Sequence, residues 1–139
     1  MGIRRRGRIL AFQSLYSHDL CASPLEELLA FTWLDPEQRE ALNEESLAFG
    51  RLIVQGTVEN LASIDKLIEN QLEHWDMSRL SRVDLALLRI SVYCLVFQKD
   101  IPASVTIDEA VDIAKEFGSD DSYRFVNGVL DAIRKRQSL

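Results

Sequence analysis

The sequence contains few residues that interrupt helices and few that hold small folds together covalently. Its 139 residues include three prolines, six glycines, two cysteines and two histidines, and 8% are aromatic. Cys21 and Cys94 lie far apart without a CxxC spacing. His74 has no metal-ligand partner three or four residues away, and His18 has a single one, Cys21. This argues against a disulfide framework or a zinc site. We therefore expect two reduced, core-facing thiols and no metal or cofactor.

Long apolar runs and catalytic signatures are also lacking. The longest runs, such as residues 85–88, fall far short of the roughly 18 residues that a transmembrane helix requires, and no apolar signal region begins the chain. No P-loop, GxGxxG or GxSxG motif occurs. With 47% apolar residues, the chain can bury a core of its own. These features predict a soluble, cytoplasmic, non-enzymatic protein forming a single domain over residues 1–139.

The net charge is −6, but the charged residues are distributed unevenly along the chain. Residues 4–8 hold four arginines and no acid, whereas residues 24–73 hold eleven acidic side chains against three basic ones. Cations at the start of a helix oppose its dipole, so helix stability does not explain the arginines. Guanidinium groups bind phosphate bidentately and stack on bases. We predict an RNA-binding segment at residues 1–8, and the alternative is a frayed terminus that only increases solubility.

The spacing of apolar residues predicts helices throughout and no convincing strand. Helices are expected over residues 4–21, 24–31 and 81–97. Another is expected from about residue 36, with an interruption near residues 42–43 and a long helical stretch that continues to about residue 72. The last two are expected to begin at a capping box at Thr106 and at residue 119. Gly56, in the middle of the long stretch, predicts a kink or a close helix contact. Leu52 and Phe97 are expected to face inward. Further helix starts are marked by Ser23, Asp35 and Ser81.

Two other polar groups have both a structural and a functional interpretation. Asp108, Glu109, Asp112 and Glu116 could hold a cation, but acids near the start of a helix are more simply a solvated face. The segment SYRFVNG, residues 122–128, places two aromatic rings and an arginine at the start of the last helix. That combination suits RNA contact, although core packing accounts equally well for its phenylalanine.

Three segments together carry a resemblance to a known family. They are RRRGR followed by AFQSLYS, then SRLSRVDLALLRISVY, then DIPASVTIDEAVDIAKEFGSDDSYRFVNGVLD. They resemble the NusB family of bacterial antitermination factors from residue 4 to about 133, with only residues 22–45 matching loosely. The resemblance implies an all-α bundle of six to seven helices in two three-helix subdomains. It also implies an RNA-binding adaptor that pairs with the small-subunit ribosomal protein NusE, binds boxA RNA of ribosomal RNA operons and joins the RNA polymerase antitermination complex.

The resemblance also assigns candidate site residues by position. The candidate RNA contacts are Arg4, Arg5, Arg6, Arg8, Gln13, Tyr16, Asp121, Ser122, Arg124 and Phe125. The candidate contacts with the ribosomal protein are Asp84, Leu88, Arg89 and Phe125. Asp84 is expected on the exposed side of the central helix, facing a basic group of the partner. Gly7 stands where a helix former would be expected, which predicts a less ordered first turn.

Two other functions stay open at this point. NusB-like domains also occur fused to RNA methyltransferases, so the chain could position RNA beside a separate catalytic subunit, since no Rossmann-like segment is present here. A purely structural helical module would use the arginines only for solubility. Self-association of the free chain into a homodimer that hides the arginines is a further open expectation.

Overall fold

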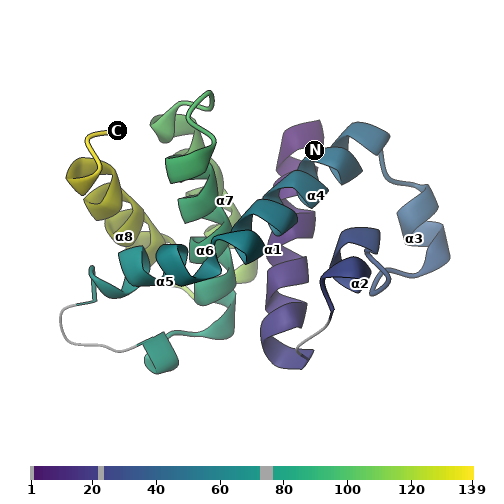
Figure 1. Cartoon of the computed structure of the whole chain (residues 1–139), viewed down its shortest axis with the longest axis horizontal. Coiled ribbons are helices and arrows are strands. Elements are labelled where there is room, and N and C mark those ends of the chain that lie inside the picture. The colour runs from purple at the N-terminus through teal and green to yellow at the C-terminus, as the bar shows by residue number, and fades with distance from the viewer. Residues whose placement is uncertain (1, 22–23, 73–76) are drawn as a thin grey trace.

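The computed structural model describes residues 2–21, 24–72 and 77–139, and all the regular structure within them is helical (Figure 1). This confirms the all-α prediction. Ser23 and His74, and the side chains of Leu20 and Cys21, lie outside the described residues. The helices are α1 (Ile3–Cys21), α2 (Leu25–Ala30), α3 (Pro36–Glu40), α4 (Glu44–Glu59), α5 (Leu61–Glu69), the 3-10 turn η1 (Met77–Arg79), α6 (Arg82–Phe97), α7 (Ala103–Phe117) and α8 (Ser122–Arg136).

Polar side chains begin several helices where the sequence predicts them. At α3, the Gln38 backbone N–H donates to Asp35 Oδ1 at 2.9 Å and the Gln38 side chain accepts from the Asp35 N–H, which forms the predicted capping box. Ser81 Oγ accepts from the Asp84 N–H at 3.0 Å at the start of α6. Asn43 caps α4, which confirms the predicted interruption near residues 42–43.

Two predicted boundaries are wrong. The long middle stretch is divided at Asn60, because its backbone and side-chain N–H groups both donate to the carbonyl of Gly56 and end α4 there. This division gives eight α-helices in the described residues instead of six to seven. The helix predicted to start at a Thr106 capping box begins one turn earlier, after Pro102. Thr106 is therefore buried inside α7, and its hydroxyl has no hydrogen-bond partner among the described residues.

Gly56 marks a close contact between α4 and α6, as one of the two interpretations predicted. A Cβ added to it would lie only 2.1 Å from Cζ of Tyr93 on α6. Tyr93 is buried, its ring stacks on Phe97 with centroids 5.7 Å apart, and its hydroxyl accepts from Gln98 Nε2 at 2.8 Å. The absence of a side chain at residue 56 therefore allows the aromatic ring to fill the space between the two helices.

Two apolar residues predicted to face inward lie at the surface instead. Leu52 is 46% exposed because its neighbour Ile53 takes the buried position on α4. Phe97 is 44% exposed at the last turn of α6, where one side of its ring is covered by Tyr93. The free thiol of Cys94 is buried, as predicted.

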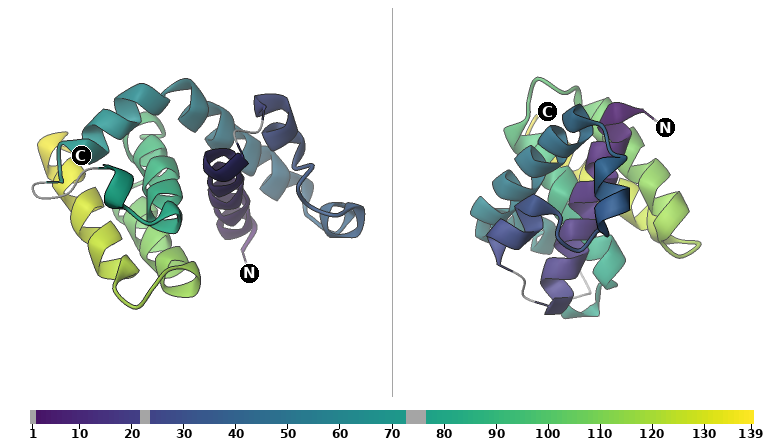
Figure 2. Two further views of the ribbon diagram at one scale, coloured as in Figure 1. Left: turned by 90° about the horizontal axis from the view of Figure 1, so that it is seen from below. Right: turned by 90° about the vertical axis from the view of Figure 1, so that its right-hand side faces the viewer.

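The helices pack in two groups around a shared core. Helix α1 lies between the short helices α2 and α3 on one side and α6–α8 on the other, and the views in Figures 1 and 2 agree on this. The main core draws buried residues from α1, α2, α4, α5, α6, α7 and α8. A smaller cluster of Leu10, Phe31, Leu34 and Leu47 lies under α2 and α3. No helix in the described part of the chain is long and apolar enough to cross a membrane.

Candidate nucleic-acid interface

The turn of α1 that carries the arginines is fixed firmly to α4. Ser46 Oγ donates a hydrogen bond to the carbonyl of Ile3 at 2.8 Å. Gly7 is buried against the same helix, and a Cβ there would lie 2.9 Å from both the Ser46 carbonyl oxygen and Cδ2 of Phe49. Gly7 therefore permits close helix packing, and the expectation that it loosens the first turn is wrong. The arginines project from a rigid element.

Arg4 and Arg6 are the arginines of this turn that form no ion pair with any described residue. Arg4 is exposed, and its guanidinium lies over the Phe49 ring at 4.7 Å from the centroid. Arg6 is half-buried and lines a shallow hollow with Gln38 and Asn43. Both side chains keep donors that an incoming phosphate can use.

Arg5 is instead held by two acids of α7. Its Nε donates to Glu109, and its Nη2 donates to Asp112 Oδ2 at 2.8 Å. The hydrogen bond to Glu109 is the largest cause that raises the pKa of the Arg5 guanidinium above its ordinary value. The sequence suggested that Glu109 and Asp112 belong to a simple solvated face. In the structure they pair with Arg5 instead. They compensate one of the arginines that oppose the dipole of α1.

Arg8 is almost completely buried, with 5% of its surface exposed. Its guanidinium lies 5.1 Å from the centroid of Phe49, and its Nη1 lies 3.9 Å from Glu109 Oε1. Its Nε has no hydrogen-bond partner among the described residues. Burial is the main cause that lowers the pKa of Arg8. In this structure Arg8 packs between helices, so it presents little surface to a nucleic acid.

Gln13 and Tyr16 continue along α1 from the arginines, and both are half-buried. Tyr16 packs against the main core, which accounts for its partial burial. Between them and the arginines, the Phe12 ring contacts Phe117 of α7 with centroids 5.4 Å apart. Side chains of α1 and α7 therefore meet both at Arg5 and at this aromatic pair.

A second group of predicted residues surrounds a hollow of about 180 Å³ between the start of α6 and the α7–α8 connection. Asp84, Asp121, Ser122 and Phe125 all line it, so the structure brings the predicted partner contact Asp84 together with predicted RNA contacts. Asp84 is half-buried, whereas the sequence suggested an exposed position, and its Oδ1 is buried without a hydrogen-bond partner among the described residues.

The remaining predicted RNA residues at α8 differ in exposure. Ser122 is buried, and its Oγ accepts from the Ser119 N–H at 3.0 Å, so its hydroxyl supports the turn. Arg124 is exposed, and its Nε donates to the Tyr123 hydroxyl at 2.9 Å. Lys115 of α7 lies over the same ring at 5.2 Å from its centroid. This lysine was missed by the sequence interpretation, because only the fold places it beside Tyr123.

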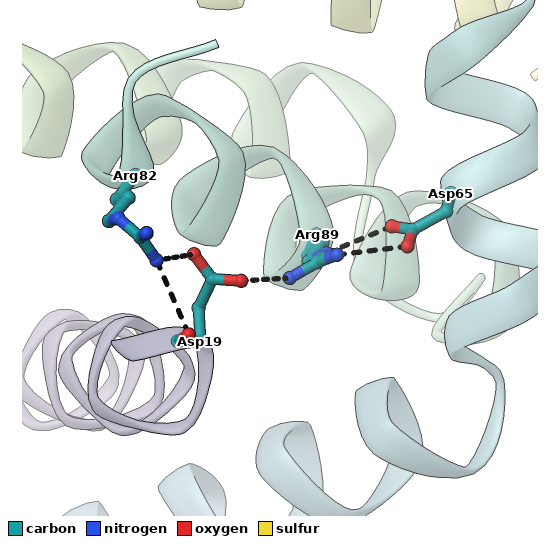
Figure 3. A network of polar contacts seen from close by, with 4 residues as sticks. All are labelled: Asp19, Asp65, Arg82 and Arg89. Carbon is teal, nitrogen blue, oxygen red and sulfur yellow. Dashed lines mark hydrogen bonds and ion pairs between the residues drawn. The ribbon is translucent and has the colours of Figure 1, made fainter. Parts of the chain in front are cut away.

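Two predicted partner contacts are not at the surface. Leu88 is fully buried in the main core. Arg89 is 11% exposed and donates to both oxygens of Asp65 on α5 at 2.9 Å, while its Nη1 lies 3.6 Å from Asp19 on α1 (Figure 3). Arg82 also donates to Asp19. Arg89 therefore links α6 to α5 and α1, and Leu88 packs in the main core, so both present little surface to a partner in this structure.

Comparison with known proteins identifies the family. The model of the NusB family matches residues 5–135. The chain belongs to the NusB family. Transcription antitermination protein NusB of Treponema pallidum (strain Nichols) is 53% identical over 132 residues, which cover 95% of this chain and 92% of the relative. NusB of Treponema denticola is 48% identical, with 96% of each chain covered.

Solved NusB structures have the same fold. That of T. maritima NusB has a TM-score of 0.84 and 44% identity, and the match covers 95% of this chain and 90% of that one. The structure of antitermination factors NusB and NusE in complex with dsRNA includes a chain with a TM-score of 0.85, 29% identity and 98% coverage of both chains. The relatives are named as transcription antitermination proteins.

Proposed function

We propose that this chain is an RNA-binding antitermination factor that pairs with the ribosomal protein NusE, binds boxA RNA of ribosomal RNA operons and acts in the RNA polymerase antitermination complex in the cytoplasm. Membership of the NusB family and the similar NusB–NusE–dsRNA structure support RNA binding and the pairing with NusE. The observation that carries the proposal is the end of α1, held against α4, where Arg4 and Arg6 form no ion pair with a described residue.

The two surfaces suggest a division of tasks. Arg4 and Arg6 would contact phosphates at one end of α1, and Gln13 and Tyr16 lie further along the same helix. The hollow beside Asp84 would receive a basic group of NusE, because two acids, Asp84 and Asp121, line it against one arginine, Arg79, and Phe125 adds an aromatic wall.

A binding experiment tests this function. Fluorescence anisotropy of a boxA-like single strand and a scrambled strand is measured at several salt concentrations, with and without NusE. We expect selective binding that tightens when NusE is present. The double variant Arg4→Ala/Arg6→Ala should bind about tenfold more weakly or worse, and the slope of log K against log salt should flatten by ~1.4, since each phosphate contact to a single strand contributes ~0.7.

The control removes the same charge elsewhere. Lys66 and Arg136 are exposed on α5 and at the end of α8, so Lys66→Ala/Arg136→Ala should leave the salt slope unchanged in the absence of NusE. Equal losses of RNA affinity in both double variants would show that Arg4 and Arg6 act only through the net charge of the protein. Equal binding of both RNAs under every condition would contradict the proposed boxA function.

A further inference from the structure

Two donor nitrogens of Arg5, Nε and Nη2, are already occupied in the free chain. Its Nε and Nη2 point to carboxylates of Glu109 and Asp112, which lie three residues apart on one face of α7. A guanidinium presents the same fork of N–H groups to a phosphate. The two acids therefore hold Arg5 by the donors that a phosphate of RNA would need.

The charge around Arg5 is also unfavourable to an incoming anion. One guanidinium faces two carboxylates, and the other cation within ion-pair distance of either acid among the described residues is Arg8, which is buried and lies 3.9 Å from Glu109. The Asp112 side chain is 51% exposed, so a phosphate that approaches Arg5 meets a negative group at the surface. By contrast, the neighbouring Arg4 and Arg6 have no acid within ion-pair distance among the described residues.

We propose that Glu109 and Asp112 form an intramolecular latch on Arg5 that competes with RNA phosphate and limits the affinity of the arginine-bearing surface. The inference rests on the proposed RNA-binding function and adds its regulation. RNA that binds only Arg4 and Arg6 leaves the latch closed. RNA that also binds Arg5 must displace the two carboxylates from its guanidinium. Each contact that RNA makes with Arg5 is therefore offset by the loss of a contact within the protein.

The latch predicts how binding changes when its acids are neutralised. Asp112→Asn keeps the shape of the side chain and removes the exposed negative charge, and RNA should then bind about threefold more tightly. Glu109→Gln/Asp112→Asn frees Arg5 fully, with about tenfold tighter binding and a salt slope steeper by ~0.7, because one more phosphate is contacted. Thermal unfolding monitored by circular dichroism verifies that each variant folds, since Glu109 is also the acid nearest to Arg8.

Two controls separate the latch from a general change in net charge. Asp108 and Glu116 are exposed on the same helix and form no ion pair with a described residue, so Asp108→Asn/Glu116→Gln removes equal charge without touching Arg5. This double variant should not steepen the salt slope. Adding Arg5→Ala to Glu109→Gln/Asp112→Asn should abolish the gain, because the latch acts only through Arg5.

Each result has one meaning. Tighter binding and a steeper slope in the latch variants alone support the inference. Weaker or unchanged binding in Glu109→Gln/Asp112→Asn, an equal gain in Asp108→Asn/Glu116→Gln, or a gain that persists without Arg5 would overturn it while wild-type RNA binding stands. If neither the wild type nor any variant binds RNA, the proposed function fails, and the latch fails with it.

Discussion

Replacing Gly56 by alanine tests the close contact between α4 and α6. The new Cβ would lie 2.1 Å from Cζ, 2.2 Å from Cε1 and 2.4 Å from the hydroxyl oxygen of Tyr93. The ring cannot move aside freely, because it is buried, stacks on Phe97 and accepts a hydrogen bond from Gln98. Either the ring leaves its place or α4 moves away from α6.

Opposing effects determine the magnitude. Overpacking of a core costs about 1–3 kcal/mol, and this contact belongs at the upper end. Displacing the ring also breaks its hydrogen bond, which costs about 1 kcal/mol. Alanine is favoured over glycine inside a helix by about 1 kcal/mol, which offsets part of the loss. We expect Gly56→Ala to lower the free energy of unfolding by about 3 kcal/mol.

Urea unfolding followed by circular dichroism at 222 nm measures this change. Gly128→Ala is the matched control, because Gly128 also lies inside a helix but an added Cβ would meet nothing within 4 Å. It should raise the free energy of unfolding by up to about 1 kcal/mol. In a Tyr93→Leu background, Gly56→Ala should become neutral or stabilising. A wild-type stability for Gly56→Ala alone would refute the clash.

Two further predictions concern buried groups. Asp65→Asn weakens the paired hydrogen bonds of Arg89 and should lower the free energy of unfolding by about 2 kcal/mol in urea titrations. The control Asp131→Asn breaks only the exposed ion pair with Lys135 and should change the free energy of unfolding by less than about 0.5 kcal/mol. Burial raises the pKa of the Cys94 thiol from 9.0 to about 11, so the folded state loses stability as the pH rises through this range. The unfolding free energy should fall by roughly 2–3 kcal/mol between pH 9 and 11, and Cys94→Ala should remove that part of the pH dependence; identical pH profiles would contradict it.

The sequence predicts the fold well where the determinants are local. The capping residues Asp35 and Ser81 are read from three or four neighbouring positions, and the structure confirms both. The end of α4 was missed because Asn60 had two options, continuing the helix or donating its amide to Gly56, and the sequence pattern does not choose between them. Leu52 was misplaced because its neighbour Ile53 is equally apolar, and only packing decides which of the two is buried.

The candidate site was predicted as a set of residues but not as a geometry. The arginines at the start of α1 predict a positive charge without acids nearby in the sequence. The acids that pair with Arg5 lie on α7, more than 100 residues further along the chain. Arg89 likewise reads as a surface residue on α6 until α5 brings Asp65 to it. Contacts of this kind depend on how helices cross, which helical periodicity along one element does not encode.

The long separation between Arg5 and its acids has a consequence for synthesis on the ribosome. Asp112 follows Arg5 by 107 residues, so translation at roughly 5–20 residues per second leaves about 5–20 s between the two. During that time the first helix has neither the acids of α7 nor the ring of Phe117 against it. The arginine-bearing turn can thus pack against α4 well before the acids of α7 are made, and throughout that interval Arg5 lacks the two carboxylates that hold it in the complete protein.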